Sequence, residues 1–318
     1  MTPASNVSIS LTETLRQRAQ MLAKVRSFFA ERKVLEVDTP LLSHYAPIDT
    51  HIDLFEVKLD HSETGYLHSS PEYAMKRLLA AGAGDIYQLS HVYRKEELGN
   101  LHNPVFTLIE WYRIKQSYAA FTRELIDLIA LFLGSQSVEI LSYRAAFQRE
   151  LSLDPFTASL DELSDLAITH QLSSTYKSVD DALNLLWGYF VEPRLGHNQL
   201  TLVTDYPASQ AALAQTVIRD GIEVAERFEV YWRGIELANG YHELRDAREQ
   251  QRRLEEANRM RSQYGKAPLP VDPYFLTALK KGLPDCYGVA VGFDRLLMLM
   301  LDLPSIKDVL SFSWNCSL

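Results

Sequence analysis

Residues with chemically useful side chains gather between positions 86 and 112, in the stretch IYQLSHVYRKEELGNLHNPVFTLIEWY. Two runs of strand-forming residues flank a charged loop, and a strand places alternate side chains on the same face. The side chains predicted to share such faces are Arg94 with Glu96 on the first arm, and Phe106 with Glu110 and Tyr112 on the second. A guanidinium suits a phosphate, and an aromatic ring suits a purine. The stretch indicates nucleotide binding, with a solvated hairpin that holds one salt bridge as the alternative.

Two further carboxylates are predicted on one face of the stretch 226–243, ERFEVYWRGIELANGYHE. If Arg233 and Gly234 form a two-residue turn, Tyr231 pairs with Glu236, and Glu236 then shares a face with Glu229. Such a pair suits Mg2+ bridged to phosphate oxygens, because this ion prefers oxygen ligands. A surface hairpin with scattered acids is the alternative.

Asn239, Tyr241 and Glu243 alternate along the strand that follows this turn. Three residues separate Glu236 from Asn239, so a flat strand would place these two side chains on opposite faces. A bulge at Gly240 is therefore expected if all of them join one site.

The composition is that of a globular enzyme, with 318 residues of which 47% are hydrophobic and 23% charged. A net charge of -9 disfavours non-specific nucleic-acid binding, which draws on clustered Lys and Arg. Cys286 and Cys316 form no CxxC pair, no apolar run approaches the ~18 residues of a membrane span, and the first residues lack a signal-peptide core. P-loop, zincin and hydrolase-elbow signatures are also absent. A soluble cytoplasmic protein without membrane contact is expected.

The remaining segments predict the elements that position these residues. Ser10 caps a helix whose apolar residues recur at helical spacing until Pro40 forbids continuation; these are Leu15, Ala19, Leu22, Val25 and Phe29. A strand at 66–69 leads into a helix that ends at Gly82, with Ser70 as N-cap, Pro71 at the first position and Glu72 in the first turn. Glu72 there also suits a simple role in stabilising the helix dipole. The other expected elements are helices at 118–133 and 244–261, a mostly helical segment at about 135–200, a strand at 200–204, and a strand followed by a helix at 287–300.

Taken in order, the first helix ending at Pro40, the VYRKE…HNPVFTLIEWY hairpin and the segment GVAVGFDR resemble motifs 1, 2 and 3 of class II aminoacyl-tRNA synthetases. The segments SPEYAMKRLL, HNPVFTLIEWY and ELANGYHEL resemble the catalytic core of lysyl-tRNA synthetases over nearly the whole chain. Because the sequence starts at the motif 1 helix, we expect no anticodon-binding domain of the kind that those enzymes carry. A core of this length is similar to the elongation factor P (R)-β-lysine ligases.

This resemblance implies an α/β fold of the α+β type, in which an antiparallel sheet is flanked by helices. It implies a single catalytic domain over residues 1–318, with a mostly helical insertion at about 135–200 and no anticodon-binding domain, and a homodimer through the first helix. The implied activity is the activation of β-lysine by ATP and Mg2+, followed by transfer to a lysine ε-amine of elongation factor P. The rivals are a truncated synthetase that charges tRNA and a regulatory paralogue without activity.

The resemblance also assigns roles to individual residues. The positions implied for ATP are Arg94, Lys95, Glu96, His102, Asn103, Phe106, Glu236, Leu237, Gly292 and Arg295, with Arg94 and Arg295 in catalytic roles. The positions implied for the amino acid are Ser70, Pro71, Glu72, Glu110, Tyr112, Asn239, Tyr241, Glu243 and Ala290. Those implied for Mg2+ are Glu229 and Glu236. Acidic residues suit a substrate with two ammonium groups.

Two departures from lysyl-tRNA synthetases fall where the α-amine would be held. The glycine-rich loop before the helix of Glu72 is replaced by HYAPIDTHIDLFEV, and the middle glycine of motif 3 is Ala290. We expect altered recognition of the amine position, because the methyl group of Ala290 fills space that a glycine would leave.

Overall fold

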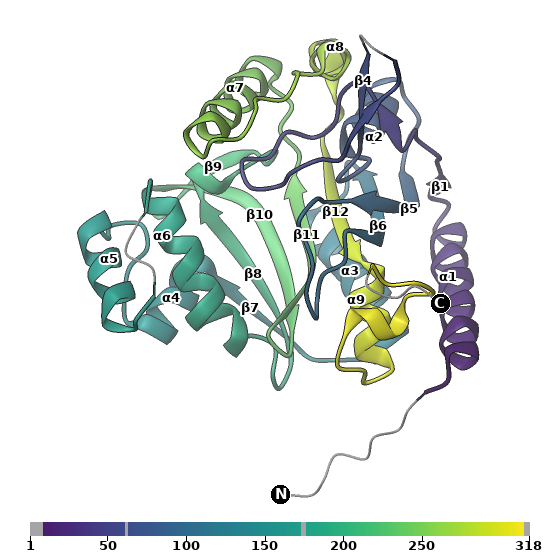
Figure 1. The fold of residues 1–318 in the computed structure, drawn as a ribbon, viewed down its shortest axis with the longest axis horizontal. Helices are drawn as coiled ribbons and strands as arrows, with labels where there is room; N and C mark the ends of the chain where they lie inside the picture. The colour runs from purple at the N-terminus through teal and green to yellow at the C-terminus, as the bar shows by residue number, and fades with distance from the viewer. Residues whose placement is uncertain (1–8, 61–62, 173–175, 315–318) are drawn as a thin grey trace, which may run out of the picture.

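The computed structural model describes residues 9–60, 63–172 and 176–314. Within these residues the central element is a nine-stranded sheet in the order β1-β5-β6-β12-β11-β10-β8-β7, with β9 beside β10 (Figure 1). Its strands are β1 Leu35–Glu36, β5 Ile86–Tyr93, β6 Val105–Ile114, β7 Val138–Ser142, β8 Leu200–Pro207, β9 Thr216–Arg219, β10 Ile222–Trp232, β11 Ile235–His242 and β12 Cys286–Gly292. All neighbours are antiparallel except β1–β5 and β7–β8. The expected antiparallel sheet flanked by helices is confirmed.

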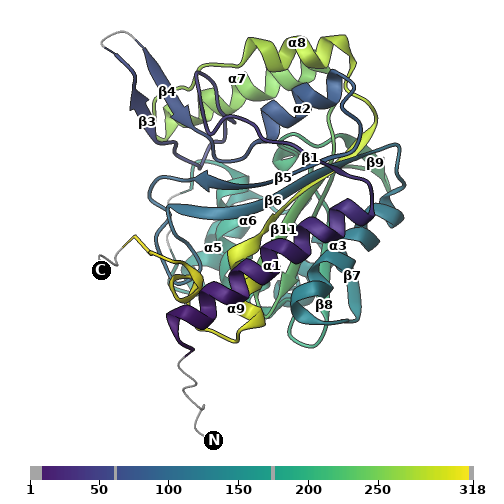
Figure 2. The same ribbon diagram turned by 90° about the vertical axis from the view of Figure 1, so that its right-hand side faces the viewer.

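One face of the sheet is covered by α1 Leu11–Glu31, α3 Tyr118–Leu133 and α9 Phe293–Met300 (Figure 2). Ser10 and Ser117 cap the first two of these helices by accepting backbone N–H bonds in the first turn. Ile109 and Trp111 of β6 point into this core and are fully buried, so their neighbours on β6 must point to the other face. The alternation along β6 therefore separates core residues from site residues.

The other helices surround the opposite side of the sheet in two groups. The first consists of α2 Glu72–Ala80, α7 Ala247–Gln263 and α8 Pro273–Gly282, beside a small sheet of β2 Leu42–Ser43, β3 Glu56–Lys58 and β4 Thr64–Leu67. The second consists of α4 Tyr143–Leu151, α5 Leu160–Thr169, α6 Val179–Leu186, a π-helical turn Trp187–Val191 and a 3-10 turn Glu192–Arg194, which pack on β8 and β10. The 3-10 turns Ala208–Gln210 and Ile306–Val309 complete the described elements.

The predicted helix at 118–133 and the strand-helix unit near 287–300 are confirmed, as is the Arg233-Gly234 turn that pairs Tyr231 with Glu236. The mostly helical segment at about 135–200 also contains β7, which belongs to the main sheet, so its status as an insertion stays a prediction.

Four local predictions were wrong. The first helix ends at Glu31 because Lys33 adopts a left-handed φ of 56°, and Leu15 and Ala19 of its predicted apolar stripe are exposed. Helix α2 has Pro71, not Ser70, at its N-cap, although the Ser70 hydroxyl accepts from the amide of Glu72 at 3.0 Å.

The other two errors concern the hairpins. β5 ends at Tyr93, so Arg94 and Glu96 do not alternate on a strand, and Glu96 has a left-handed φ of 67°. The expected bulge in β11 exists, but the register shifts between Val230–Ala238 and Tyr231–Glu236, which makes Leu237 the extra residue instead of Gly240. A bulge at Leu237 still brings Glu236 and Asn239 to one side.

Among the described residues no helix is both long and apolar enough to cross a membrane. Cys286 is a buried free thiol, and Cys316 lies outside the described residues.

Candidate active site

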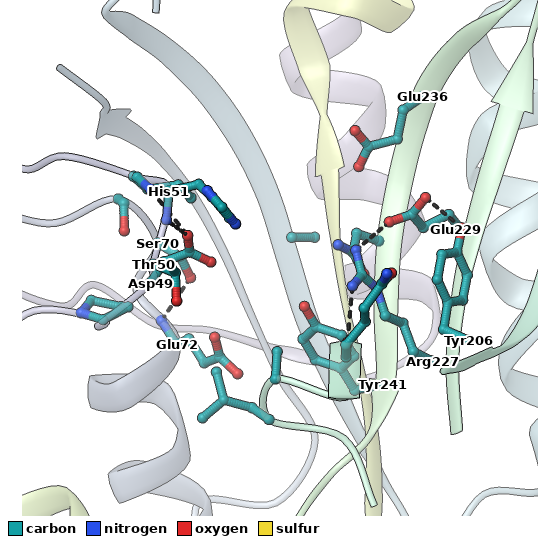
Figure 3. A pocket seen from close by; sticks show the side chains of 18 of the residues that line it. Asp49, Thr50, His51, Ser70, Glu72, Tyr206, Arg227, Glu229, Glu236 and Tyr241 are labelled. Atoms are coloured by element: carbon teal, nitrogen blue, oxygen red, sulfur yellow. Dashed lines mark hydrogen bonds and ion pairs between the residues drawn. The ribbon is translucent and has the colours of Figure 1, made fainter. Parts of the chain in front are cut away.

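A cavity of about 1010 Å3 lies on the face of the sheet opposite α1 and α3. Its walls come from the strands β6, β10, β11 and β12, helices α2, α6 and α7, and the loop at 47–52. Figure 3 shows Asp49, Ser70 and Glu72 on one side, facing Glu229 and Glu236 across the open space. The volume suits a pair of small-molecule substrates.

Two rows of side chains cross the floor of this cavity, because the registers of three strands align them. Ala290 of β12 pairs with Asn239 on one side and with Glu110 on the other. One step along, Gly288 pairs with Tyr241 and with Tyr112. Residues from the second and third predicted motifs therefore meet at the centre of the sheet.

A buried ion pair cluster occupies one end of the cavity. The Lys76 ammonium lies 2.6 Å from Glu72 Oε1 and 2.5 Å from Glu243 Oε2, and its side chain is fully buried. Burial raises the pKa of Glu243 to about 8, against the lowering effect of Lys76. Burial alone would lower the pKa of Lys76, but Glu243 and Glu72 raise it above its usual value. Lys76 therefore keeps its charge and neutralises only one of its two carboxylate neighbours.

Glu110 adds a third carboxylate to this end of the cavity. It accepts hydrogen bonds from the hydroxyls of Ser70 and Tyr112, each at 2.7 Å, and is almost fully buried. Burial, followed by the charge of Glu72, raises its pKa to about 7. The raised pKa values mean that Glu110 and Glu243 hold protons when no ligand compensates them. A ligand with two cationic groups favours ionisation of both carboxyls, because three carboxylates and one ammonium need two further positive charges for neutrality.

Position 288 requires a glycine because the side chains of Glu243 and Tyr112 lie very close to its backbone. A Cβ atom at this position would lie 2.2 Å from Glu243 Oε1 and 2.3 Å from Tyr112 Cε1, inside any tolerable contact. The missing side chain lets the carboxylate and the phenol ring of the pocket lie against the strand backbone.

The other end of the cavity holds guanidinium groups and an aromatic ring. The Arg94 guanidinium lies 5.1 Å from the centre of the Phe106 ring. Arg295 donates to the carbonyl oxygen of Glu236 at 2.7 Å and to His102 Nε2 at 2.9 Å. Burial, followed by the charge of Arg295, lowers the pKa of His102, so this ring is a neutral acceptor. These residues can bind a flat base and polyanionic phosphates.

Glu229 is held rigidly in the wall between these two ends. Its carboxylate accepts from Arg227 Nη2 at 2.5 Å, from the Tyr206 hydroxyl at 2.5 Å, and from the Tyr231 hydroxyl. Arg227 also lies over the ring of Tyr206, 4.7 Å from its centre (Figure 3). Glu236 makes a longer 3.4 Å ion pair with Arg295, and its side chain is 35% exposed, so it is the freer carboxylate of the two.

Most residues that the sequence predicted for a site line this cavity. These are Ser70, Glu72, Arg94, His102, Asn103, Phe106, Glu110, Tyr112, Glu229, Glu236, Leu237, Asn239, Tyr241, Glu243, Ala290, Gly292 and Arg295. Pro71, Lys95 and Glu96 are not among the lining residues, and the side chain of Glu96 is 75% exposed. Glu97 takes the cavity position that was predicted for Glu96, because the chain leaves β5 before Arg94.

Sequence reasoning missed Arg227, Gln250 and Glu192, which also line the cavity. Arg227 was unassigned, although its position two residues before Glu229 on a strand places both side chains on one face. Gln250 lies on the charged helix α7 and is almost fully buried. Glu192 follows the π-helical turn, and burial together with Glu236 and Glu229 raises its pKa to about 7. No periodic pattern in the sequence marked Glu192 as a site residue.

The fold and the cavity define a class of protein, and comparison with known proteins agrees with it. The family model "tRNA synthetases class II (D, K and N)" matches residues 5–315, and the chain belongs to this family. Within it, the chain is similar to proteins named "Elongation factor P--(R)-beta-lysine ligase" from Salmonella dublin, Salmonella paratyphi B and Salmonella heidelberg. Each is 48% identical over 307 residues, which is 94% of either chain.

Proposed function

We propose that this protein is an ATP-dependent ligase that activates (R)-β-lysine as an acyl-adenylate and transfers it to the ε-amine of a lysine on elongation factor P. The observation that carries the proposal is the pocket in which the three carboxyl groups of Glu72, Glu110 and Glu243 gather around a single ammonium, that of Lys76. Cationic groups of a ligand would favour the ionised form of these carboxyls. A diamino acid supplies two ammonium groups to this pocket, and its carboxylate then points towards the guanidinium end of the cavity. The names of the similar proteins support the same substrates.

The residues at the guanidinium end have distinct roles in the proposed first step. Phe106 stacks on adenine, Arg94 neutralises the α-phosphate where the carboxylate attacks, and Arg295 binds the γ-phosphate. His102 fixes the orientation of Arg295 through their 2.9 Å hydrogen bond. Pyrophosphate leaves as the carboxyl–phosphorus bond forms, so catalysis consists of alignment and stabilisation of charge. The acceptor amine then attacks the acyl carbon, and AMP leaves.

The cavity suits a magnesium ion that arrives with ATP. Among the described residues, no group of three or more His, Cys, Asp and Glu side chains is arranged to hold a metal ion. Glu236 is free to bind Mg2+, whereas both oxygens of Glu229 already accept hydrogen bonds. This donor set fits Mg2+ held by one or two carboxylates and the phosphate oxygens of the substrate. When bound there, the ion supplies positive charge to the phosphates.

The acceptor and the amino acid can be tested in one experiment. The purified protein is incubated with ATP, Mg2+ and either (R)-β-lysine or α-lysine, together with elongation factor P or total tRNA, and products are measured by intact-mass spectrometry. We expect a one-lysyl mass gain on elongation factor P, larger with β-lysine. Elongation factor P with its acceptor lysine replaced by arginine is the matched control. A gain on tRNA alone favours the truncated synthetase, and no gain on either favours the regulatory paralogue.

A homodimer through α1 is also part of the proposal. Leu11 and Leu15 on α1 and Leu35 of β1 are 50%, 39% and 55% exposed, so this side of the molecule presents apolar side chains that an α1 contact would cover. Light scattering after size exclusion is expected to give twice the chain mass, and replacing Leu11 and Leu15 by Glu is expected to give the monomer mass.

A further inference from the structure

Arg18 of α1 joins the three segments that carry the sequence resemblance. Its Nη1 lies 2.5 Å from Asp294 Oδ1, and its Nη2 donates to Thr107 Oγ1 at 2.6 Å. The backbone N–H of Thr107 donates to Asp294 Oδ2 at 2.6 Å, which closes a ring of three residues. α1, β6 and α9 are therefore connected through a single guanidinium.

Thr107 and Asp294, the two side-chain hydrogen-bond partners of Arg18, are each adjacent to a residue proposed to bind ATP, whereas a longer 3.4 Å bond goes to the carbonyl oxygen of Val309. Thr107 follows Phe106 on β6, and Asp294 precedes Arg295 in the first turn of α9. Arg18 itself is not among the residues that line the cavity. Its influence on a bound nucleotide must therefore pass through Thr107 and Asp294.

The hydrogen-bonded ring of Arg18, Thr107 and Asp294 lies where β12 stops pairing with β6, while β5 stays paired with β6 on the other side. The β6–β12 pairing ends at Leu108 and Gly292, because the chain turns from β12 into α9. The Asp294 carboxylate accepts the Thr107 N–H one residue beyond this end, in place of a strand partner. Asp294 is 1% exposed, and Arg18 is the cation that compensates its charge.

We propose that Arg18 is a positioning residue for ATP, which fixes the distance between the Phe106 ring and the Arg295 guanidinium. The proposed function places these two groups at opposite ends of the nucleotide, on adenine and on the γ-phosphate, and the inference rests on that assignment. Because β12 does not pair with β6 at Thr107, the Arg18 link supplies a fixed connection between β6 and the start of α9, which lets both ends of ATP bind without further rearrangement.

The test is the variant Arg18→Lys, which keeps the charge but lacks the fork that reaches both partners. The loss of one hydrogen bond to a charged group is expected to raise the Kd and KM for ATP about tenfold. The KM for β-lysine is expected to stay within about twofold, because its pocket shares no hydrogen bond with the ring. Thr107→Val removes only the hydroxyl acceptor, and combining it with Arg18→Lys is expected to add little, as for two residues in one network.

A matched control separates positioning from stability. Arg144 makes a two-point ion pair with Asp154, at 2.9 Å for both contacts, in the helical segment after β7. Arg144→Lys is expected to lower the melting temperature without changing ATP affinity. The inference is overturned if Arg18→Lys lowers the melting temperature in the same way with unchanged ATP affinity, or if it raises the KM of both substrates equally.

ATP affinity is measured by calorimetry in the absence of any amino acid. The result for Arg18 therefore does not depend on whether the protein uses β-lysine, and the inference and the proposed function can be refuted independently. Weaker ATP binding by Arg18→Lys supports positioning even if the unmodified protein rejects β-lysine, an outcome that refutes only the ligase assignment. Wild-type protein that activates β-lysine while Arg18→Lys binds ATP normally refutes only the role of Arg18.

Discussion

Replacing Gly288 by alanine is expected to damage the amino-acid pocket and leave the nucleotide end intact. The new methyl group would lie 2.2 Å from Glu243 Oε1 and 2.3 Å from Tyr112 Cε1, whereas ordinary contacts begin at 3.4 Å. Both side chains must therefore retreat by about 1 Å or more. Glu243 cannot retreat without lengthening its 2.5 Å contact with Lys76, and Tyr112 cannot without disturbing its hydrogen bond to Glu110.

The size of the effect follows from the interaction that is lost. Overpacking a filled site costs about 1–3 kcal/mol of folding free energy. Loss of one charged hydrogen bond to a substrate ammonium costs about 1.5–3 kcal/mol, which corresponds to roughly a 10- to 100-fold higher KM for β-lysine. The assay is β-lysine-dependent ATP–pyrophosphate exchange, with the ATP dissociation constant measured separately by calorimetry.

Two other glycines provide matched controls. Gly65→Ala places its methyl group 2.9 Å from Leu42 in the small sheet, so it tests overpacking away from the pocket. Gly99→Ala meets nothing within 4 Å. Both are expected to keep the wild-type KM for β-lysine. The reasoning is refuted if Gly288→Ala keeps it too, or if ATP affinity falls in parallel.

Four further predictions address the same cavity. Arg94→Ala is expected to lower adenylate formation by about 100- to 1000-fold, and robust pyrophosphate exchange in this variant would contradict the role of Arg94. Ala290→Gly opens space between Asn239 and Glu110 and is expected to increase activation of α-lysine relative to β-lysine; an unchanged ratio would contradict the steric explanation. Glu110 and Glu243 have pKa values raised to about 7 and about 8 from 4.5, so the KM for β-lysine is expected to fall as pH rises from 6 to 8 and both carboxyls ionise. Because the native state keeps protons that the unfolded state releases above pH 4.5, these two groups also make the free energy of unfolding decrease as pH rises towards 8, and Glu110→Gln is expected to flatten that decrease in denaturant titrations.

Much of the local structure was readable because it depends on neighbours in the sequence. Ser10 and Ser117 accept hydrogen bonds from amides three residues ahead, so their effect on helix starts is contained in a few positions. The turn at Arg233 and Gly234 and the alternation of Phe106, Glu110 and Tyr112 are equally local. The sequence by itself therefore determined the turn between β10 and β11, the helix at 118–133 and most of the residues that face the cavity from β6 and β11.

Only the tertiary structure decided how these residues act on one another. Lys76 and Glu243 are far apart in the chain, and their 2.5 Å contact exists because the fold brings α2 beside the residue that follows β11. The loop after β5 brings Glu97 instead of Glu96 to the cavity, and the bulge at Leu237 depends on the partner strand β10. Burial by several elements at once raises the pKa of Glu110 and Glu192. Spacing along the chain determines which face a side chain takes, but the charge balance of a pocket depends on which distant segments meet there, and that is a property of the packed fold.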